Sequence, residues 1–159
     1  LDERVKAALE RLVERKGFII GIGAGMASLV DANYFGNISD KLMFKTNLNK
    51  KYVSAMQDVR VLGKSYVSDG EYEYSAPISG RMITLECEDL EELSKQVDII
   101  AMNKVNLLPG DCGVDTIASK DGHIIGIRTL VERMTEGLYK NIEIIGLPKH
   151  FASLRKNFK

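Results

Sequence analysis

The stretch GFIIGIGAGMASLVDANYFG, residues 17–36, decides how the first part of the chain folds. Its apolar run at residues 18–22 predicts a buried strand, and the small-residue segment 26–34 predicts a helix. Between them lie three alternating glycines: Gly21, Gly23 and Gly25. The order is therefore strand, tight glycine turn, helix.

The glycine turn has two interpretations, a ligand site and a structural turn. A dinucleotide fingerprint is excluded, because the position of its third glycine falls on Met26 or on Ser28. The Gly-Lys-Ser/Thr ending of a phosphate-binding P-loop is also missing. What remains is an anion site at the helix N-terminus, with Ser28 as an additional donor. We favour the structural turn over this anion site.

The helix predicted before this turn is amphipathic. Asp2 is its expected N-cap, and Gly17 lies where a left-handed C-terminal residue is expected. Its apolar residues recur with helical spacing. They are Val5, Ala8, Leu9, Leu12 and Val13.

The middle of the chain reads as strands and hairpins. Two hairpins are predicted, one over residues 60–78 with its turn at Asp69–Gly70, and one over residues 114–128 with its turn at Asp121–Gly122. The other elements expected between residues 41 and 105 are listed in chain order: a strand at 41–47, a helix or irregular crossover at 48–59, a strand at 80–87, a helix at 90–96 capped by Asp89, and a strand at 97–105.

The C-terminal part predicts a helix at 129–140, a strand at 142–147 and a helix at 148–158. The last helix ends in a basic tail. A nucleic-acid contact is one interpretation of that tail, and we favour a helix end matched to its own dipole.

Together these elements predict one globular domain over residues 1–159 of the α/β to α+β class. We expect a mixed or largely antiparallel sheet with helices packed on it. Because the chain begins at Leu1, we also expect that it is excised from a longer one.

Composition excludes several classes of protein. The 22 basic residues equal the 22 acidic ones, which argues against a general polyanion binder and makes a homodimer plausible. Cys87 and Cys112 are expected to be reduced thiols, and no apolar run approaches the roughly 20 residues that span a membrane. These features predict a cytoplasmic protein, and no metal motif is present.

A second candidate site lies in residues 111–123, where polar side chains crowd a loop and a hairpin. Its members are Asp111, Cys112, Asp115, Lys120, Asp121 and His123. The context of Cys112 is like that of some cysteine peptidases, but neither histidine has the spacing that such an enzyme needs. The competing interpretation, which we favour, is a polar loop with an Asp-Gly turn.

Two hypotheses about function follow. The first is a small-molecule-sensing or regulatory domain that acts as a homodimer. Its ligand, expected to be anionic, would contact the three glycines, Ser28, Asp111, Cys112 and His123. The alternative is a small enzyme acting on a phosphorylated or carboxylated metabolite, with Asp111 or Asp115 and Lys120 transferring protons. A nucleic-acid-binding module is a third, weaker hypothesis.

Overall fold

The computed structural model describes residues 2–65 and 68–134 as two sheets with three α-helices and a short 3-10 turn. The helices are α1 (Glu3–Glu14), α2 (Ala24–Asp31) and α3 (Leu90–Gln96), and the 3-10 turn is Val131–Met134. The strands are β1 (Ile19–Ile22), β2 (Leu42–Lys45), β3 (Val53–Ser65), β4 (Ser68–Gly80), β5 (Thr84–Cys87), β6 (Val97–Asn103), β7 (Val114–Ser119) and β8 (Ile124–Ile127).

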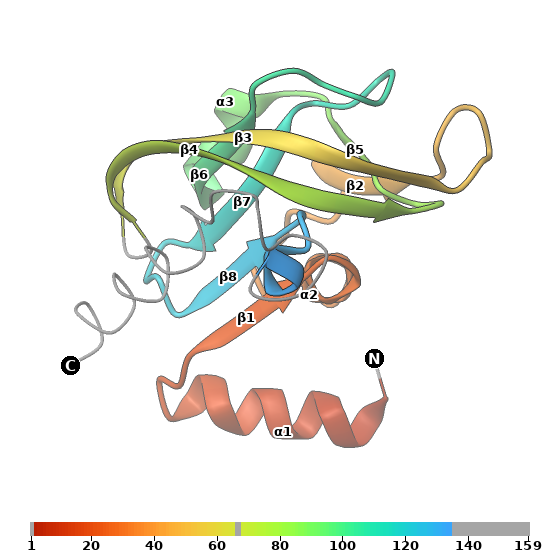
Figure 1. The fold of residues 1–159 in the computed structure, drawn as a ribbon. Helices are drawn as coiled ribbons and strands as arrows, with labels where there is room; N and C mark the ends of the chain where they lie inside the picture. The colour runs from red at the N-terminus through yellow and green to blue at the C-terminus, as the bar shows by residue number, and fades with distance from the viewer. Residues whose placement is uncertain (1, 66–67, 135–159) are drawn as a thin grey trace.

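The main sheet has six strands in the order β1-β8-β7-β6-β3-β4. β1 pairs with β8 in parallel, and the other four pairs are antiparallel. The long β3–β4 hairpin curls across the top of the molecule, and β2 and β5 form a separate antiparallel pair (Figure 1). The prediction of a mixed sheet in an α+β domain is confirmed.

Buried apolar side chains form two clusters. One gathers around α2 and includes Met26, Leu29, Phe35 and Ile117. The other lies under the curled hairpin and includes Val59, Tyr74 and Ile125. The short strands β7 and β8 contribute to both clusters, so they form the centre of the fold.

The N-terminal helix α1 forms as predicted, with the side chain of Asp2 accepting a hydrogen bond from Arg4 N at 2.8 Å. Its left-handed residue is Lys16, with φ 54°, so the prediction for Gly17 was wrong by one residue. Gly17 N instead donates to Leu12 O at 2.8 Å, completing a Schellman cap. A Cβ on Gly17 would lie 2.2 Å from Leu12 Cδ1, which explains the glycine.

Both predicted hairpins form, but only one of their two turns lies where it was predicted. β7 and β8 turn at Asp121–Gly122 as expected, with Gly122 at φ 75°. In the other hairpin β3 ends at Ser65, which pairs with Ser68 at the start of β4. The expected turn at Asp69–Gly70 was wrong, and both residues lie within β4.

Residues 48–59 were expected to form a helix or a crossover, and this was also wrong. β3 begins at Val53 and alternates inward residues such as Gln57 and Val59 with exposed ones. The polar Gln57 obscures the alternation in the sequence, but its side-chain amide donates to two backbone carbonyls, so it can be buried.

The remaining predictions have mixed outcomes. The helix at 90–96 is confirmed, with Asp89 accepting from Glu91 N and Glu92 N. α2 begins two residues earlier than expected. The helix expected at 129–140 is described only as far as residue 134, and Val131–Met134 form a 3-10 turn. The strand expected at 142–147 and the helix expected at 148–158 lie outside the described residues. None of the helices in the described part of the chain combines the length and the apolar character that a membrane crossing requires.

Candidate functional site

The glycine turn joins β1 directly to α2 (Figure 1). Gly23 forms the apex with φ 57° and ψ −115°, a backbone conformation that residues with a side chain rarely adopt. Its N–H donates to Ile127 O at 2.8 Å, so the apex also continues the β1–β8 ladder. Helix α2 begins at the next residue, Ala24.

The three glycines have different roles. A Cβ on Gly21 would lie 2.6 Å from Leu29 Cδ1 and 2.7 Å from Gly25 O, so Gly21 allows close packing of α2 on β1. A Cβ on Gly23 would meet Leu130 Cδ2 at 2.7 Å. A Cβ on Gly25 would have no atom within 4 Å. The structural interpretation therefore fits Gly21, and the space beside Gly25 is open.

The N-terminus of α2 is accessible at its first two residues. Ala24 is exposed and Gly25 is half-buried, whereas Met26 is fully buried. Helix geometry leaves the N–H groups of Ala24, Gly25 and Met26 without an intrahelical acceptor, and the first helical bond runs from Ala27 N to Gly23 O at 3.3 Å. These N–H groups carry the positive end of the helix dipole.

Ser28 is not part of this opening. Because α2 begins at Ala24, Ser28 is the fifth helical residue and lies in the second turn. It lines a hollow of about 350 Å³ between α1 and α2, together with Lys6 and Asn33. Ser28 therefore faces this hollow, and its contact with a bound anion stays a prediction.

The turn has the layout of an elbow that presents a catalytic nucleophile. Such elbows place the nucleophile at the apex of a strained strand-to-helix turn, in the pattern Gly-x-nucleophile-x-Gly. Gly21 and Gly25 match the two flanking glycines, and the apex is Gly23. The turn therefore provides backbone N–H groups and no nucleophile, and Leu130 approaches the place that an apex side chain would take.

Asp115 fixes the segment that borders this turn. Its buried carboxylate accepts hydrogen bonds from Tyr74 OH at 3.1 Å and Thr116 Oγ1 at 2.9 Å. It also accepts from Thr129 N and Thr129 Oγ1, both at 3.2 Å. Burial, and then the charge of Asp115, raise the pKa of Tyr74 well above its usual value, so the phenol stays a donor. Asp115 thus holds in place Thr129 and its neighbour Leu130.

Asp111 forms a buried ion pair with Arg128, and both side chains are 1% exposed. The carboxylate also accepts from Leu85 N at 3.1 Å and Gly113 N at 2.8 Å, which ties the loop before β7 to β5. Arg128 Nε and Nη2 contact no acceptor among the described residues. Asp111 is consequently the main partner of this buried charge.

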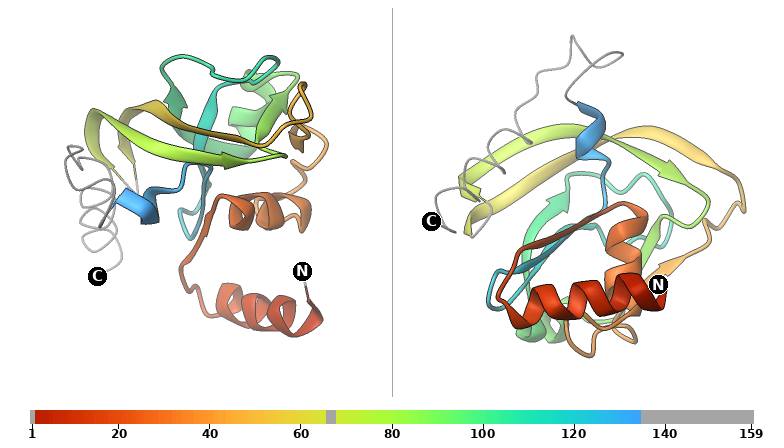
Figure 2. Two further views of the ribbon diagram at one scale, coloured as in Figure 1. Left: turned by 45° about the vertical axis from the view of Figure 1, so that its right-hand side comes forward. Right: turned by 90° about the horizontal axis from the view of Figure 1, so that it is seen from below.

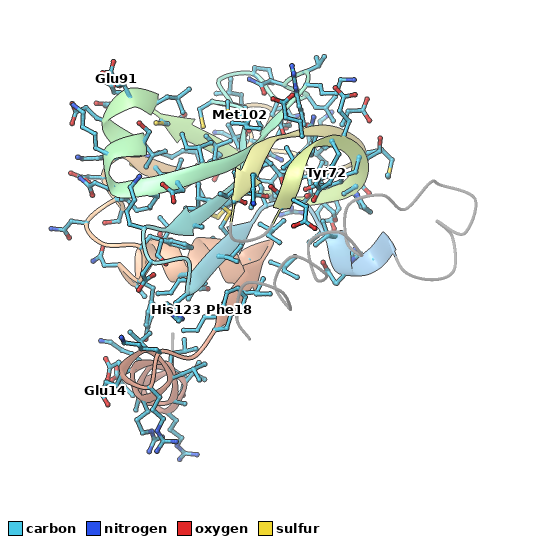
Figure 3. All side chains as sticks on the ribbon, turned by 90° about the vertical axis from the view of Figure 1, so that its left-hand side faces the viewer. Glu14, Phe18, Tyr72, Glu91, Met102 and His123 are labelled. Carbon is cyan, nitrogen blue, oxygen red and sulfur yellow. The ribbon has the colours of Figure 1, made fainter. Side chains whose placement is uncertain are left out.

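Lys120 and His123 lie at the other end of the β7–β8 hairpin. Lys120 pairs with Asp98 at 2.6 Å and donates to Ser94 O at 2.7 Å. His123 lies beside Phe18 at the start of β1, on the side of the sheet that is nearest to α1 (Figure 3). The structure therefore separates Lys120 and His123 from Asp111 and Asp115 by most of the length of β7, about 15 Å for a strand of this length.

Cys112 lies next to β5, where its N–H donates to Leu85 O at 2.7 Å. Burial is the main cause that raises the pKa of its thiol to about 11. Burial likewise raises the pKa of Cys87. Both cysteines are free, and a thiol with a raised pKa is a poor nucleophile at neutral pH.

A larger hollow lies between the end of β3, helix α3 and β6. Its volume is about 690 Å³, and its lining includes Lys64, Ser94, Asp98 and Ile99. Volumes of this size are typical of small-molecule sites. Sequence analysis did not identify it, because the curl of the hairpin brings β3 and β6 together.

The buried contacts of Tyr74, Arg128 and Thr129 with Asp111 and Asp115 were not predicted from the sequence. A single arginine after the apolar run HIIGI was the available signal for a buried ion pair. In the described part of the chain, no group of three or more histidine, cysteine or acidic side chains is arranged to hold a metal ion.

Comparisons with known proteins find a likeness of fold. No protein-family model matches the sequence, and no curated protein matches it. A chain in the structure of PurLQS from Thermotoga maritima matches with a TM-score of 0.73 and 18% identity. The match covers 95% of this chain and 66% of that chain. This protein therefore shares the fold of about two thirds of that chain.

Replacing Asp111 with alanine is expected to reduce the free energy of unfolding by about 3–5 kcal/mol, because it leaves the buried Arg128 without its charge partner. Glu71→Ala is the matched control: it removes one partner of the exposed Arg60–Glu71 pair and should cost less than about 1 kcal/mol. Urea denaturation measures both. Equal costs would show that the Asp111–Arg128 pair does not hold the fold.

In the native protein, the Cys112 thiol is expected to resist alkylation at pH 8, because a pKa of about 11 leaves roughly one thiol in a thousand ionised. A Cys87→Ser variant isolates Cys112, and iodoacetamide labelling followed by mass spectrometry measures the rate. The rate should rise about tenfold per pH unit up to about pH 11, and unfolding in urea should abolish the protection. Fast labelling of the native protein at pH 8 would contradict the burial.

Proposed function

We propose that this protein is a small-molecule-binding domain that receives an anionic ligand at the open N-terminus of α2 and does not use the glycine turn for covalent catalysis. The observation that carries the proposal is the elbow with Gly23 at its apex. Gly23 has the positive φ of a catalytic elbow, although this residue is not a nucleophile. A regulatory or sensing role fits an elbow that binds without reacting, and the cytoplasm is the compartment that we propose.

The open space beside Gly25 supports an anionic ligand. The first N–H groups of α2 carry the positive end of the helix dipole beside the exposed Ala24, and such groups bind phosphate or carboxylate without a charged side chain. Arg128 lies one residue after the carbonyl that accepts from Gly23. Its buried pairing with Asp111 neutralises its charge, so it is not a ligand contact.

The positions of the residues proposed to transfer protons support this proposal over the enzyme hypothesis. The proton-transfer pair proposed from the sequence combines Lys120 with Asp111 or Asp115, and these residues lie at opposite ends of β7. Both carboxylates are buried and already accept several hydrogen bonds. The predicted homodimer is not required by the proposal and stays a prediction.

Two substitutions at Gly25 test the proposal. The site has room for a side chain, so both Gly25→Ala and Gly25→Asp should fold, and alanine should stabilise α2 by about 0.5–1 kcal/mol. Aspartate also suits the first turn of a helix, but its carboxylate would repel an anion. The measurement is the shift in Tm with inorganic phosphate, nucleotides, sugar phosphates and carboxylic acids at constant ionic strength.

At 100 times its dissociation constant, a bound anion should stabilise the native protein and Gly25→Ala by about 2.7 kcal/mol. Gly25→Asp should lose this stabilisation and keep its own fold. The proposal fails if Gly25→Asp responds like the native protein. A response that Lys64→Glu removes and Gly25→Asp retains would assign the ligand to the hollow beside β6 instead.

A further inference from the structure

The ladder between β3 and β6 stops part-way along both strands. Their antiparallel pairing ends at Val61↔Ala101, although both strands continue. Figure 2 shows the long β3–β4 hairpin curving across the shorter strands of the sheet. The hollow of about 690 Å³ opens where the pairing ends, and it is lined by residues 62–65 of β3, residues 97–100 of β6 and Ser94. The two strand segments are those that would form the next four pairs of the ladder if its register continued.

A β-bulge in β6 explains why the ladder ends. Against β7, Ile99 pairs with Ile117 and Ala101 pairs with Thr116, so Ile100 is an extra residue. A bulge disrupts the ladder locally and changes which backbone groups face each neighbouring strand. Beyond the bulge, β6 keeps its pairing with β7 and loses its pairing with β3.

The hydrogen bonds of β3 show which of its backbone groups face the hollow. Asp58 O accepts from Lys104 N at 2.9 Å, so the even-numbered residues of β3 direct their N–H and C=O groups toward β6. β3 pairs with β4 without a register shift, so this alternation continues to the end of the strand. The backbone N–H and C=O of Lys64 are therefore directed into the hollow.

The same argument identifies the facing groups of β6. Asp115 O accepts from Arg128 N at 2.8 Å, so Asp115 faces β8 and, three residues later, Ala118 faces β6. Ala118 pairs with Asp98, whose backbone groups consequently face β7. Ile99 is the next residue, and its N–H and C=O point the opposite way, into the hollow.

The hollow thus has a strand edge on each of two sides. No strand in the described part of the chain lies between these edges. Each edge presents donors and acceptors, and backbone groups of this kind take hydrogen-bond partners. The charge of Asp98 is balanced by Lys120 at 2.6 Å, and Leu62 adds an apolar side chain that is 46% exposed. An extended peptide matches this lining, because it carries donors and acceptors along both of its sides.

We propose that the hollow is a docking site for an extended peptide segment of a partner protein, inserted between β3 and β6. The segment pairs with Lys64 on one side and with Ile99 on the other. Four pairs correspond to about 13 Å of strand, or about four peptide residues. Recognition is by backbone groups, so it tolerates different side chains and does not require a charged peptide. This site is independent of the anion site proposed at α2.

A partner segment fits this site better than a strand from a second copy of this chain. An inserted strand uses both of its sides, so both must be free before it binds. Every strand among residues 2–65 and 68–134 already pairs with at least one neighbour. A described strand of a second copy would therefore have to leave its own sheet.

A neutral capped peptide, acetyl-Val-Thr-Val-Thr-amide, tests the docking. It is titrated to millimolar concentration into the isotope-labelled protein, and the amide resonances are followed. The largest shifts should fall on Lys64 and Ile99, and these two amides should exchange at least about tenfold more slowly with the peptide bound. An analogue that is N-methylated at both valines keeps the side chains but loses two donors, so it should bind at least about tenfold more weakly.

Three results would overturn the proposal. The first is the absence of shifts at Lys64 and Ile99 with millimolar peptide. The second is slow exchange of both amides in the free protein, which would show that this chain fills its own hollow. The third is protection that grows with protein concentration without peptide, which would assign the site to a second copy.

Two substitutions of one residue separate backbone recognition from side-chain recognition. Lys64→Ala and Lys64→Pro both remove the side chain, and only proline removes the N–H that faces the hollow. This N–H takes no part in the β3–β4 ladder, so the strand accepts proline here. Lys64→Ala should bind the peptide like the native protein, and Lys64→Pro should bind it at least about fivefold more weakly. Equal binding by the two variants would contradict the proposal, and the N-methylated peptide decides the question if Lys64→Pro does not fold.

The Gly25→Asp variant distinguishes this site from the anion site. Its peptide binding should equal that of the native protein, because Gly25 does not line the hollow. Loss of peptide binding in Gly25→Asp would place the peptide at α2 and overturn the proposal. Loss of the anion response alone leaves the peptide site as proposed.

Discussion

The Asp115 carboxylate accepts hydrogen bonds from three parts of the chain: Tyr74 in the curled hairpin, Thr116 in its own strand and Thr129 after β8. A buried carboxylate is tolerated when it has several donors, and here the donors link the two sides of the sheet. Hydrogen bonds to Asp115 fix the backbone conformation of residues 128–130. Leu130 then lies over Gly23, so the shape of the glycine turn depends on a carboxylate in a different strand.

The glycine turn has the backbone geometry of a catalytic elbow but lacks the nucleophile. The combination of φ 57° and ψ −115° is costly for any residue with a side chain, and elbows with this strain normally use it to present a nucleophile. Gly23 adopts the same conformation without cost and without a reactive group. What the turn still presents is a set of backbone donors at the start of α2. For this reason we propose binding, and not catalysis, as the role of the turn.

Local patterns in the sequence predicted the parts of the fold that depend on nearby residues. The Asp2 and Asp89 caps, the Asp121–Gly122 turn and the strand-turn-helix at the glycines were all predicted correctly. The errors came from long-range pairing. The register of β3 with β4 placed Asp69 and Gly70 within a strand, and it made a strand of a segment whose buried Gln57 obscures the pattern. The candidate site was divided for the same reason: β7 places Asp115 and Lys120 toward opposite ends of the sheet, a separation that residue spacing in the sequence does not reveal.

The central claim is that the N-terminus of α2 is the place where an anion binds. The most direct measurement is a titration of the isotope-labelled protein with inorganic phosphate at constant ionic strength, followed by the amide resonances. The account predicts that the largest shifts fall on Ala24, Gly25 and Met26, whose N–H groups lack intrahelical acceptors. Unchanged resonances at these three residues, with shifts gathered instead around Ile99 and Ile100 in the hollow beside β6, would contradict it.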